Sequence, residues 1–317
     1  MKFLITGGAG FIGSAFTRML LNGDFNVIPT HVTVVDALTY SGNLKTLMPI
    51  EFSPKFRFIK GDICDQEMIA TLIRTTDVII NFAAETHVDR SIVNQMPFIR
   101  TNVLGTGVLL TEAVKNKKII FIQVSTDEVY GSIENGSWDE NCNLQPNSPY
   151  AASKAGSDLL ALSYNKTFGL DVRITRCCNN FGPYQFPEKI IPLFVSKLLK
   201  GQKVPIYGIG NNFREWIFVE DHCHAIWKTL IHGKSGNVYN IGSNTELSNL
   251  DLTKKILYSL KLDESFIEFV PDRLGHDFRY SLNSEKAKRE LGFESTSNFD
   301  EKLDDTLNWY RDNSIFT

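Results

Sequence analysis

Cysteine is scarce in this sequence, and neither acidic nor basic residues dominate it. The 317 residues include five scattered cysteines, an odd number without a paired pattern, which indicates a reducing compartment rather than a disulfide scaffold. The formal net charge is -3. Nucleic-acid-binding domains usually have a strongly basic patch, so no nucleic-acid partner is predicted.

Long apolar runs are missing as well. No stretch approaches the roughly 18 apolar residues of a membrane-spanning helix, so no membrane association is predicted. The first residues, "MKFLITGGAGFIG", do not resemble a secretion signal, because glycines interrupt their short apolar run at once. Together with the cysteine usage, this pattern predicts a cytoplasmic protein.

Short apolar runs alternate with amphipathic stretches in the first half of the chain. This rhythm predicts an α/β fold, a doubly wound parallel sheet with helices on both faces. The expected strands span 2–6, 32–36, 56–62, 77–84, 118–125 and 170–177. The expected helices between them span 11–22, 65–75, 95–116 and 149–168.

The rhythm ends near residue 180, where "NNFGPYQFPEKIIP" (179–192) is rich in Pro, Gly and Asn and is predicted as a loop. Further helices are expected at 190–200, 249–260, 283–291 and 298–312. We therefore expect a smaller, partly discontinuous C-terminal lobe above the carboxyl ends of the strands, where ligands bind in open α/β sheets. The predicted division is a nucleotide-binding domain at 1–180 with a return segment at about 215–242, and a substrate lobe at 181–214 and 243–317.

A glycine-rich turn follows the first expected strand and opens the first expected helix. In "ITGGAGFIGS" (5–14), Gly7, Gly10 and Gly13 form G-x-x-G-x-x-G, a variant of the dinucleotide-binding pattern. Glycine permits the tight turn and lets the backbone approach a pyrophosphate at the helix N-terminus. Asp36 ends the second strand, where a carboxylate binds a ribose 2′-hydroxyl and repels a 2′-phosphate, so NAD is favoured over NADP. The alternative is glycine-rich packing in a fold that has lost its cofactor.

The motif "KGDICD" supports the cofactor interpretation. Asp62 and Ile63 are expected at the end of the third strand, near the adenine, although Asp62 also suits a helix N-cap. The full set of expected cofactor contacts is Gly7, Gly10, Phe11, Ile12, Gly13, Asp36, Asp62, Ile63, Ala83, Ala84, Thr86, Ser125, Tyr150, Lys154 and Cys177.

In "SPYAASKAGSD" (148–158), Tyr150 and Lys154 lie one helical turn apart and share a face. The lysine ammonium, with a nicotinamide charge nearby, is expected to lower the pKa of Tyr150. A phenolate then deprotonates an alcohol while hydride leaves for NAD, and Lys154 is also placed to hold the nicotinamide ribose. Y-x-x-x-K alone is common by chance, and a surface pair is the alternative. The glycine turn and the "VST" strand end favour the catalytic interpretation.

Taken together, these features resemble the extended short-chain dehydrogenase/reductase family. The motifs "AAETHVDRS", "STDEVYG", "NNFGPYQFPEKIIP", "REWIFVEDH" and "GHDFRY" narrow the resemblance to nucleotide-sugar 4,6-dehydratases of the dTDP-glucose type, over nearly the whole chain. The resemblance implies a Rossmann-like fold and a tightly bound NAD that is regenerated in each turnover. It also implies a homodimer joined by a helix bundle. Helices 95–116 and 149–168 have apolar residues enough for that interface, although the same faces also suit the core.

The resemblance further implies that a nucleoside-diphosphate glucose loses water without net redox change. Tyr150 takes the proton of the C4 hydroxyl, Thr126 hydrogen-bonds that oxygen, and NAD accepts the hydride. Glu128 is the implied base that removes the C5 proton, and Asp127 the implied acid that protonates the departing C6 hydroxyl. NADH then returns its hydride to C6, which gives a 4-keto-6-deoxy sugar.

Physical chemistry places two constraints on Asp127 and Glu128. Adjacent side chains of a regular strand point to opposite faces, so the chain must leave strand geometry near Thr126 if both acids are to reach one sugar. Two nearby carboxylates also disfavour double ionisation, so one keeps its proton, but this does not decide which. The alternative is a solvated acidic pair with Asp127 as an N-cap.

Substrate contacts are implied by the resemblance, and arginines suit the pyrophosphate because they bind phosphate bidentately. Each of these residues is otherwise an ordinary surface residue. Phe278 stands where a second basic residue is expected, and "CCNN" contains an extra cysteine. The implied contacts are His87, Asp89, Asn180, Glu188, Lys189, Pro205, Tyr207, Arg214, Asn249, Arg273 and His276.

No metal site is predicted. His222, Cys223 and His224 lie on an expected helix, where positions two apart do not face each other. No other close cluster of metal-ligating residues completes a site around them.

The nearest alternative function is a nucleotide-sugar C4 epimerase, which also needs NAD, Thr126, Tyr150 and Lys154 but has no use for two acids. A UDP-glucuronate decarboxylase is another relative, and the carboxylate of its substrate disfavours Asp127. A non-catalytic, NAD-sensing binding module would tolerate loss of Tyr150 and Lys154, and both are present. The choice between dTDP-glucose and UDP-glucose stays open.

Overall fold

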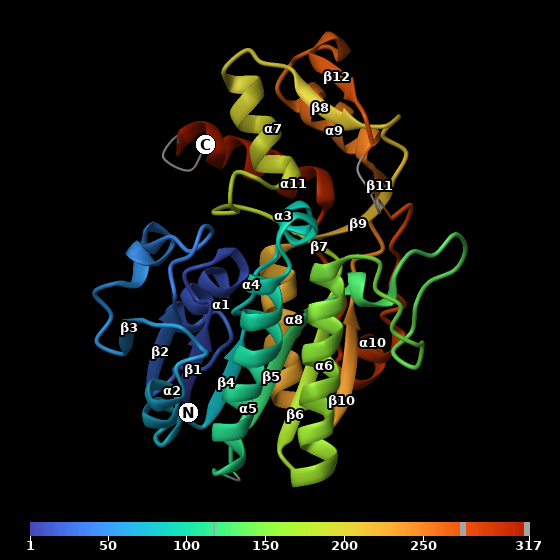
Figure 1. Ribbon diagram of the computed structural model, residues 1–317. Helices are drawn as coiled ribbons and strands as arrows, with labels where there is room; N and C mark the ends of the chain where they lie inside the picture. The colour runs from blue at the N-terminus through green and yellow to red at the C-terminus, as the bar shows by residue number, and fades with distance from the viewer. Residues whose placement is uncertain (117, 273–276, 314–317) are drawn as a thin grey trace.

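A seven-stranded parallel sheet forms the larger part of the protein, in the order β10-β6-β5-β4-β1-β2-β3 (Figure 1). The computed structural model describes residues 1–116, 118–272 and 277–313. The predicted doubly wound α/β sheet is confirmed. Its strands are β1 (Lys2–Thr6), β2 (His31–Asp36), β3 (Phe56–Lys60), β4 (Val78–Asn81), β5 (Ile120–Thr126), β6 (Asp171–Cys177) and β10 (Asn237–Ile241).

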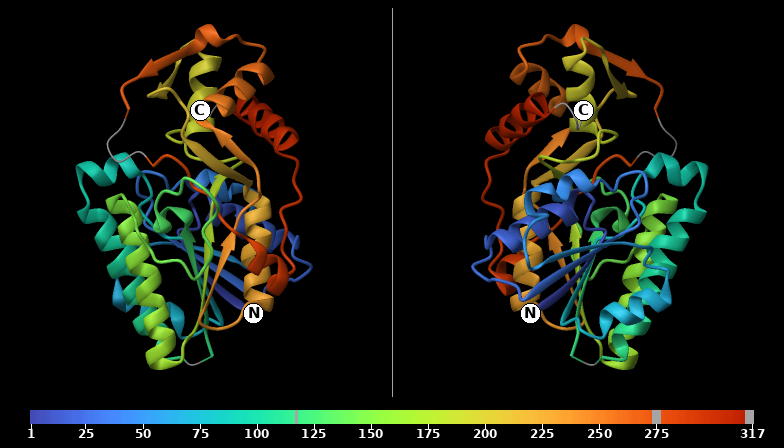
Figure 2. Two further views of the ribbon diagram at one scale, coloured as in Figure 1. Left: turned by 90° about the vertical axis from the view of Figure 1, so that its right-hand side faces the viewer. Right: turned by 90° about the vertical axis from the view of Figure 1, so that its left-hand side faces the viewer.

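Helices cover both faces of this sheet (Figure 2). On one face, α1 (Phe11–Asn22) and α8 (Val219–His232) share a core with alternate residues of the central strands. On the other face, α2 (Gln66–Ile73), α5 (Thr106–Val114) and α6 (Pro149–Phe168) pack against the intervening residues. Because strand side chains alternate between faces, the apolar runs seen in the sequence serve both layers.

The expected helix at 95–116 is not a single α-helix. It consists of α4 (Met96–Phe98), a π-helical segment η2 (Ile99–Gly105) and α5. The expected strand at 77–84 is shorter as well, because β4 ends at Asn81 and the next three residues leave the sheet.

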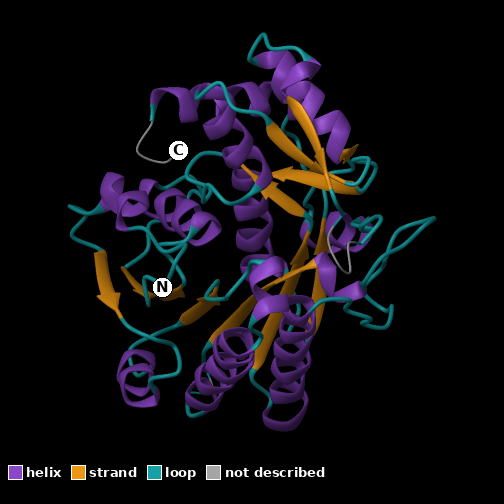
Figure 3. Cartoon of the chain, turned by 45° about the horizontal axis from the view of Figure 1, so that its top comes forward, coloured by secondary structure: helices purple, strands orange, loops and turns teal. Residues whose placement is uncertain are grey.

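A second lobe lies above the carboxyl ends of the strands (Figures 1 and 3). It contains a three-stranded sheet of β7 (Asn179–Phe181), β9 (Phe213–Phe218) and β11 (Glu246–Ser248), and a pair, β8 (Val204–Tyr207) and β12 (Ile267–Val270). The expectation of loop from residue 179 is therefore wrong at its start, where β7 pairs with β9, whereas α7 confirms the helix expected at 190–200. The helices of the lobe are α7 (Ile190–Leu199), α9 (Asn249–Ser259) and α11 (Phe299–Asp312).

The C-terminal part of the chain contacts both the layer around the large sheet and the second lobe. The helix α10 (Glu285–Leu291) packs against α8 and β10 of the large sheet, whereas α11 packs against α7 and α9 of the lobe. The remaining short elements are α3 (Val88–Val93), η1 (Leu44–Ile50), η3 (Asp127–Tyr130) and η4 (Glu264–Phe266). No helix in the described parts of the chain is long and apolar enough to span a membrane.

The sheet core should dominate the stability of the protein. Phe121 on β5 is fully buried, so Phe121→Ala should lower the free energy of unfolding by about 3–5 kcal/mol. Phe52 is 90% exposed, and Phe52→Ala should change it by less than about 0.5 kcal/mol. Urea unfolding followed by circular dichroism measures both, and equal losses would contradict the assignment of the core.

Candidate active site

A cavity of about 1120 Å³ lies between the carboxyl ends of the strands and the second lobe. Arg273 and His276 lie outside the described residues. All the other residues predicted as cofactor, catalytic or substrate contacts line this cavity: Gly7, Gly10, Phe11, Ile12, Gly13, Asp36, Asp62, Ile63, Ala83, Ala84, Thr86, His87, Asp89, Ser125, Thr126, Asp127, Glu128, Tyr150, Lys154, Cys177, Asn180, Glu188, Lys189, Pro205, Tyr207, Arg214 and Asn249.

The glycine turn fits a dinucleotide. Gly7 has a φ of 66°, and a Cβ there would lie 2.6 Å from the backbone nitrogen of Ala83. A Cβ on Gly13 would lie 2.5 Å from the carbonyl oxygen of Gly7. Helix α1 has no side-chain cap and no acidic residue in its first turn, so its N-terminus suits an anion.

Asp36 is held rigidly at the end of β2. Its Oδ2 accepts a hydrogen bond from the amide of Ala9 at 2.9 Å, and its Oδ1 accepts one from the amide of Leu38 at 2.8 Å. Burial raises the pKa of this carboxyl, and the two amides oppose that shift. The side chain thus presents a fixed acceptor to the cavity wall, as expected for a ribose contact.

Asp62 and Ile63 lie beyond the end of β3, because that strand stops at Lys60. Their predicted place at the strand end is therefore wrong, although both residues line the cavity. Asp62 is also not a helix N-cap: Asp65 caps α2 by accepting from the amide of Met68. Asp62 instead accepts from the amide of Cys64 at 2.8 Å and pairs with Arg100.

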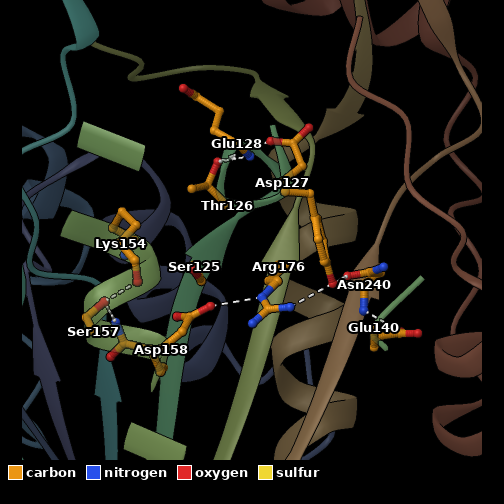
Figure 4. Close-up of polar contacts among 12 residues, drawn as sticks. Ser125, Thr126, Asp127, Glu128, Glu140, Lys154, Ser157, Asp158, Arg176 and Asn240 are labelled. Atoms are coloured by element: carbon orange, nitrogen blue, oxygen red, sulfur yellow. Dashed lines mark hydrogen bonds and ion pairs between the residues drawn. The ribbon is translucent and has the colours of Figure 1, made fainter. Parts of the chain in front are cut away.

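The chain leaves strand geometry where the two acids begin, as predicted. Strand β5 ends at Thr126, and η3 starts at Asp127. The Thr126 hydroxyl donates to Oδ1 of Asp127 at 3.1 Å and accepts from the amide of Glu128 at 3.3 Å. Thr126, and not Asp127, is therefore the N-cap. Figure 4 shows both acidic side chains directed away from the sheet.

The environment of Asp127 favours its protonated form. The side chain is buried, and its Oδ2 has no hydrogen-bond partner among the described residues. Burial, followed by the charges of Glu128 and Glu215, raises the pKa of Asp127 well above its usual value. A carboxyl that keeps its proton is suited to act as an acid, which agrees with the role implied for Asp127 by the resemblance.

Tyr150 and Lys154 lie at the start of α6, whose N-cap Ser148 accepts from the amide of Ala151. The Lys154 ammonium donates to the carbonyl of Val124 at 2.7 Å. Burial lowers the pKa of Lys154, and Asp158 opposes this shift.

The expected lowering of the Tyr150 pKa is wrong for the protein by itself. Burial, then the charges of Glu128, Cys177 and Asp127, raise the pKa of the Tyr150 phenol well above its usual value. The desolvation of the phenolate and these negative charges thus outweigh the hydrogen bond with Thr126, which lowers the pKa of Tyr150.

The segment between β7 and α7 borders the cavity and contacts residues that follow β2 and β4 of the large sheet. Glu188 pairs with Arg90 at 3.2 Å and lies 3.8 Å from the imidazole of His87. Arg90 also lies over the ring of Tyr40, 4.1 Å from its centroid, and Tyr40 packs edge-on against Phe186. Lys189 donates to the carbonyl of Thr86 at 3.4 Å. These contacts close one side of the cavity.

Asn180 and Arg214 are both held by buried partners. Oδ1 of Asn180 lies 2.9 Å from Nδ1 of His222 on α8, and burial lowers the pKa of that imidazole to about 3. A neutral His222 therefore orients the Asn180 amide. Arg214 donates to the carbonyl of Asp277 at 3.0 Å and lies over the ring of Tyr280.

The helix predicted around His222 is α8. Within the described residues, no group of three or more His, Cys, Asp or Glu side chains is arranged to bind a metal ion.

Several lining residues were not predicted, among them Phe186, Trp216 and Tyr280. Tyr280 closes the motif "GHDFRY", and Phe186 lies in the predicted loop, so the motifs already pointed to both. Trp216 on β9 reads as an ordinary core residue, and its place at the cavity follows only from the pairing of β9 with β7 and β11.

Comparison with known proteins agrees with this geometry. The model of the family described as GDP-mannose 4,6 dehydratase matches residues 4–306. The chain belongs to this family. Within it, a dTDP-glucose 4,6-dehydratase from Streptomyces niveus is 52% identical over 314 residues, covering 99% of this chain and 94% of the relative. The family member described here is thus of the dTDP-glucose 4,6-dehydratase type, and the prediction of a hydro-lyase is confirmed.

Solved structures of relatives extend the comparison. DesIV, a dTDP-glucose 4,6-dehydratase from Streptomyces venezuelae solved with NAD and TYD bound, has a TM-score of 0.98 and 53% identity, covering 99% of this chain and 98% of its own. The Bacillus anthracis dTDP-glucose 4,6-dehydratase solved with NAD has a TM-score of 0.93 and 45% identity, covering 100% and 98%. The prediction of NAD as cofactor is confirmed by these family members.

The burial of Asp127 has a measurable consequence for stability. Its folded pKa lies above the unfolded value of about 3.9, so its contribution is present below that value and is lost as pH rises toward the folded pKa. Asp127→Asn cannot ionise, so its free energy of unfolding should rise relative to the wild type between about pH 5 and pH 8, by up to ~1.4 kcal/mol per pH unit. Urea titrations at both pH values measure this difference. Asp24 is exposed, and Asp24→Asn serves as control. If the difference in free energy of unfolding between Asp127→Asn and the wild type is the same at both pH values, the raised pKa of Asp127 is contradicted.

Proposed function

We propose that this protein is an NAD-dependent nucleoside-diphosphate-glucose 4,6-dehydratase that acts on dTDP-glucose or UDP-glucose and forms the 4-keto-6-deoxy sugar. The observation that supports this most is the buried Asp127 beside Glu128 on one turn of the cavity wall, next to Tyr150. Relatives of about half identity are named dTDP-glucose 4,6-dehydratases, which supports the thymidine nucleotide as the first substrate to test.

The cofactor site is assigned to the glycine turn and Asp36. Gly7 and Gly13 allow the close backbone packing of the turn that presents the start of α1 to the pyrophosphate, and Asp36 is the acceptor for the ribose hydroxyls. NAD, when bound, accepts a hydride from C4 of the sugar and later delivers it to C6. The protein part that holds it is residues 1–180 with the return segment at about 215–242, and the lobe at 181–214 and 243–317 holds the nucleotide sugar.

The proton transfers are assigned to four side chains. Tyr150 removes the proton of the C4 hydroxyl, and Thr126 hydrogen-bonds the same oxygen. Glu128 removes the proton at C5, which the new C4 ketone has made acidic. Asp127, protonated in its buried environment, gives its proton to the C6 hydroxyl, which leaves as water. Lys154, one helical turn after Tyr150 on α6, is assigned to stabilise the Tyr150 phenolate that accepts the proton of the C4 hydroxyl.

The substrate contacts are assigned by position on the cavity wall. His87, Asp89 and Asn180 lie on the side of the hexose. Pro205 and Tyr207 on β8 and Asn249 at the start of α9 border the nucleoside. Glu188 and Lys189 lie on the segment proposed to meet the nucleotide sugar, and Arg214 suits the pyrophosphate or the ribose. For Arg273 and His276, the same role remains a prediction.

A second copy of the chain is the proposed partner. Leu104 and Leu159 are more than half exposed, and an apolar groove of about 410 Å³ runs between η2, α5 and α6. Contiguous exposed apolar surface of this kind marks interaction sites. A homodimer through these helices would cover it. The expected cytoplasmic location remains a prediction.

A nucleotide-sugar C4 epimerase is the alternative with the closest fold. A UDP-glucose 4-epimerase from Thermotoga maritima has a TM-score of 0.91 at 28% identity, so the fold does not separate the two functions. The paired acids favour the dehydratase, because epimerisation at C4 transfers no proton at C5 and no hydroxyl from C6.

The decisive assay offers dTDP-glucose and UDP-glucose separately in D₂O and follows the sugar by NMR. A new C6 methyl group with deuterium at C5 is expected. A galacto product without C5 exchange would instead establish an epimerase, and no turnover of either sugar nucleotide would favour a binding module.

The base assignment predicts the behaviour of one variant. Glu128→Gln should retain C4 oxidation but lose C5 solvent exchange and dehydration by about 10²–10⁴-fold, since general-base catalysis contributes that much. The same NMR assay with the wild type as reference measures it. Glu134→Gln, an exposed acid on the loop after η3, is the matched control and should turn over normally. Unchanged C5 exchange in Glu128→Gln would overturn the role of Glu128.

A further inference from the structure

A buried chain of polar side chains crosses the protein beneath the candidate active site (Figure 4). Arg176 on β6 donates from Nε to Oδ2 of Asp158 on α6 at 2.9 Å. The same guanidinium donates from Nη1 to the hydroxyl of Tyr130 at 2.8 Å. Tyr130 in turn donates to Oδ1 of Asn240 on β10 at 2.8 Å. One arginine therefore links a helix to a turn.

The two partners of Arg176 in this chain, Asp158 and Tyr130, lie on the two elements that hold the proposed catalytic groups. Asp158 lies one helical turn after Lys154 and two after Tyr150, all on α6. Tyr130 is the last residue of η3, which starts with Asp127 and continues with Glu128. The link thus runs from the residues of the oxidation step to those of the water elimination.

None of the three linking residues lines the cavity. Asp158 and Tyr130 are fully buried, and Arg176 is 3% exposed. The ring of Tyr130 is also fixed by stacking on Trp138, with centroids 6.1 Å apart. These residues can therefore influence substrate only through the elements that they join.

Stability alone is a weak explanation for this arrangement. The desolvation of a buried ion pair costs about as much as its attraction returns, and apolar residues of similar volume often serve as well. Asp158 in addition leaves its Oδ1 without a hydrogen-bond partner among the described residues. The link instead fixes the relative orientation of Asp158 and Tyr130, because a planar guanidinium holds both of its partners in one geometry.

We propose that Asp158, Arg176 and Tyr130 are positioning residues that hold the turn with the two acids in register with the helix of Tyr150 and Lys154. This proposal rests on the dehydratase function proposed above. A sugar oxidised at C4 must present C5 and C6 to Glu128 and Asp127 without moving away, so the two elements need a fixed relative position. Misplacement of a catalytic group by about 1 Å costs on the order of 10²-fold in rate.

Tyr130→Phe tests the directional part of the link. It keeps the ring, over which the Arg176 guanidinium lies at 4.8 Å from the centroid, and removes the hydroxyl that accepts from Nη1. Oxidation is measured in a single turnover by the absorbance of reduced nicotinamide, and elimination by the rate of C6 methyl formation in D₂O. We expect oxidation within about twofold of the wild type and elimination at least about tenfold slower. Reduced cofactor should therefore accumulate in the variant.

Tyr239→Phe is the matched control. Tyr239 is fully buried in the same core cluster as Tyr130, but its hydroxyl accepts from the amide of Lys234, which lies on neither η3 nor α6. Tyr239→Phe should lower the unfolding temperature as Tyr130→Phe does, but leave the ratio of the oxidation rate to the elimination rate unchanged.

Arg176→Lys provides the second variant, and it substitutes for the first if Tyr130→Phe does not fold. Lysine keeps the positive charge beside Asp158 but cannot donate in two fixed directions. It should shift the ratio in the same direction, and Tyr130→Phe added to it should have little further effect, since coupled residues are not additive.

The outcomes separate this proposal from the proposed function. A wild type that neither oxidises nor dehydrates a sugar nucleotide overturns both. An active wild type whose Tyr130→Phe or Arg176→Lys variant keeps the wild-type ratio of oxidation to elimination overturns the positioning role alone. If the effects of Tyr130→Phe and Arg176→Lys on this ratio multiply fully in the double variant, the two residues act independently, and the link is likewise overturned.

Discussion

The cavity depends on one constraint, the parallel direction of all seven strands in the large sheet. Parallel pairing brings every carboxyl end to the same edge, so β1, β2 and β5 deliver their terminal residues to one place. The glycine turn follows β1, Asp36 ends β2, and Thr126 ends β5. An antiparallel neighbour would have placed one of these groups some 15–20 Å away, at the opposite edge.

Burial then gives the gathered groups their chemical character. Asp127 and Glu215 are two acids in the same low-dielectric region, and burial raises both pKa values. Glu215 accepts hydrogen bonds from the amides of Ser243, Asn244 and Leu282, which oppose the shift. Among the described residues, Asp127 accepts only from the Thr126 hydroxyl, on one oxygen. The difference in amide donors explains how one acid serves as structure while its neighbour is suited to proton transfer.

Local patterns predicted much of this arrangement. The glycine spacing, Asp36 and the Tyr150–Lys154 pair each depend on a few adjacent residues. The departure from the strand at Thr126 followed from side-chain alternation together with the condition, implied by the family resemblance, that both acids reach one sugar. The π-helical η2 and the short strand β7 were not predicted, because they depend on tertiary contacts: Gly105 packs against Ile63, and β7 needs β9.

The direction of the Tyr150 pKa could not be read from the sequence either, because desolvation depends on how completely the rest of the fold covers the phenol. The same holds for Arg176. Its partners lie 18 and 46 residues away, and nothing in their spacing marks them as neighbours.

The contact between Glu188 and Arg90 gives the protein a property of a different kind. It joins α3 to the segment before α7, two parts of the cavity wall that lie 98 residues apart in the sequence. The Arg90 side chain is 52% exposed, and exposed ion pairs are weak and screened by salt. Ionic strength should therefore weaken this link in the cavity wall while leaving the buried groups, such as Asp127 and Tyr150, screened from salt.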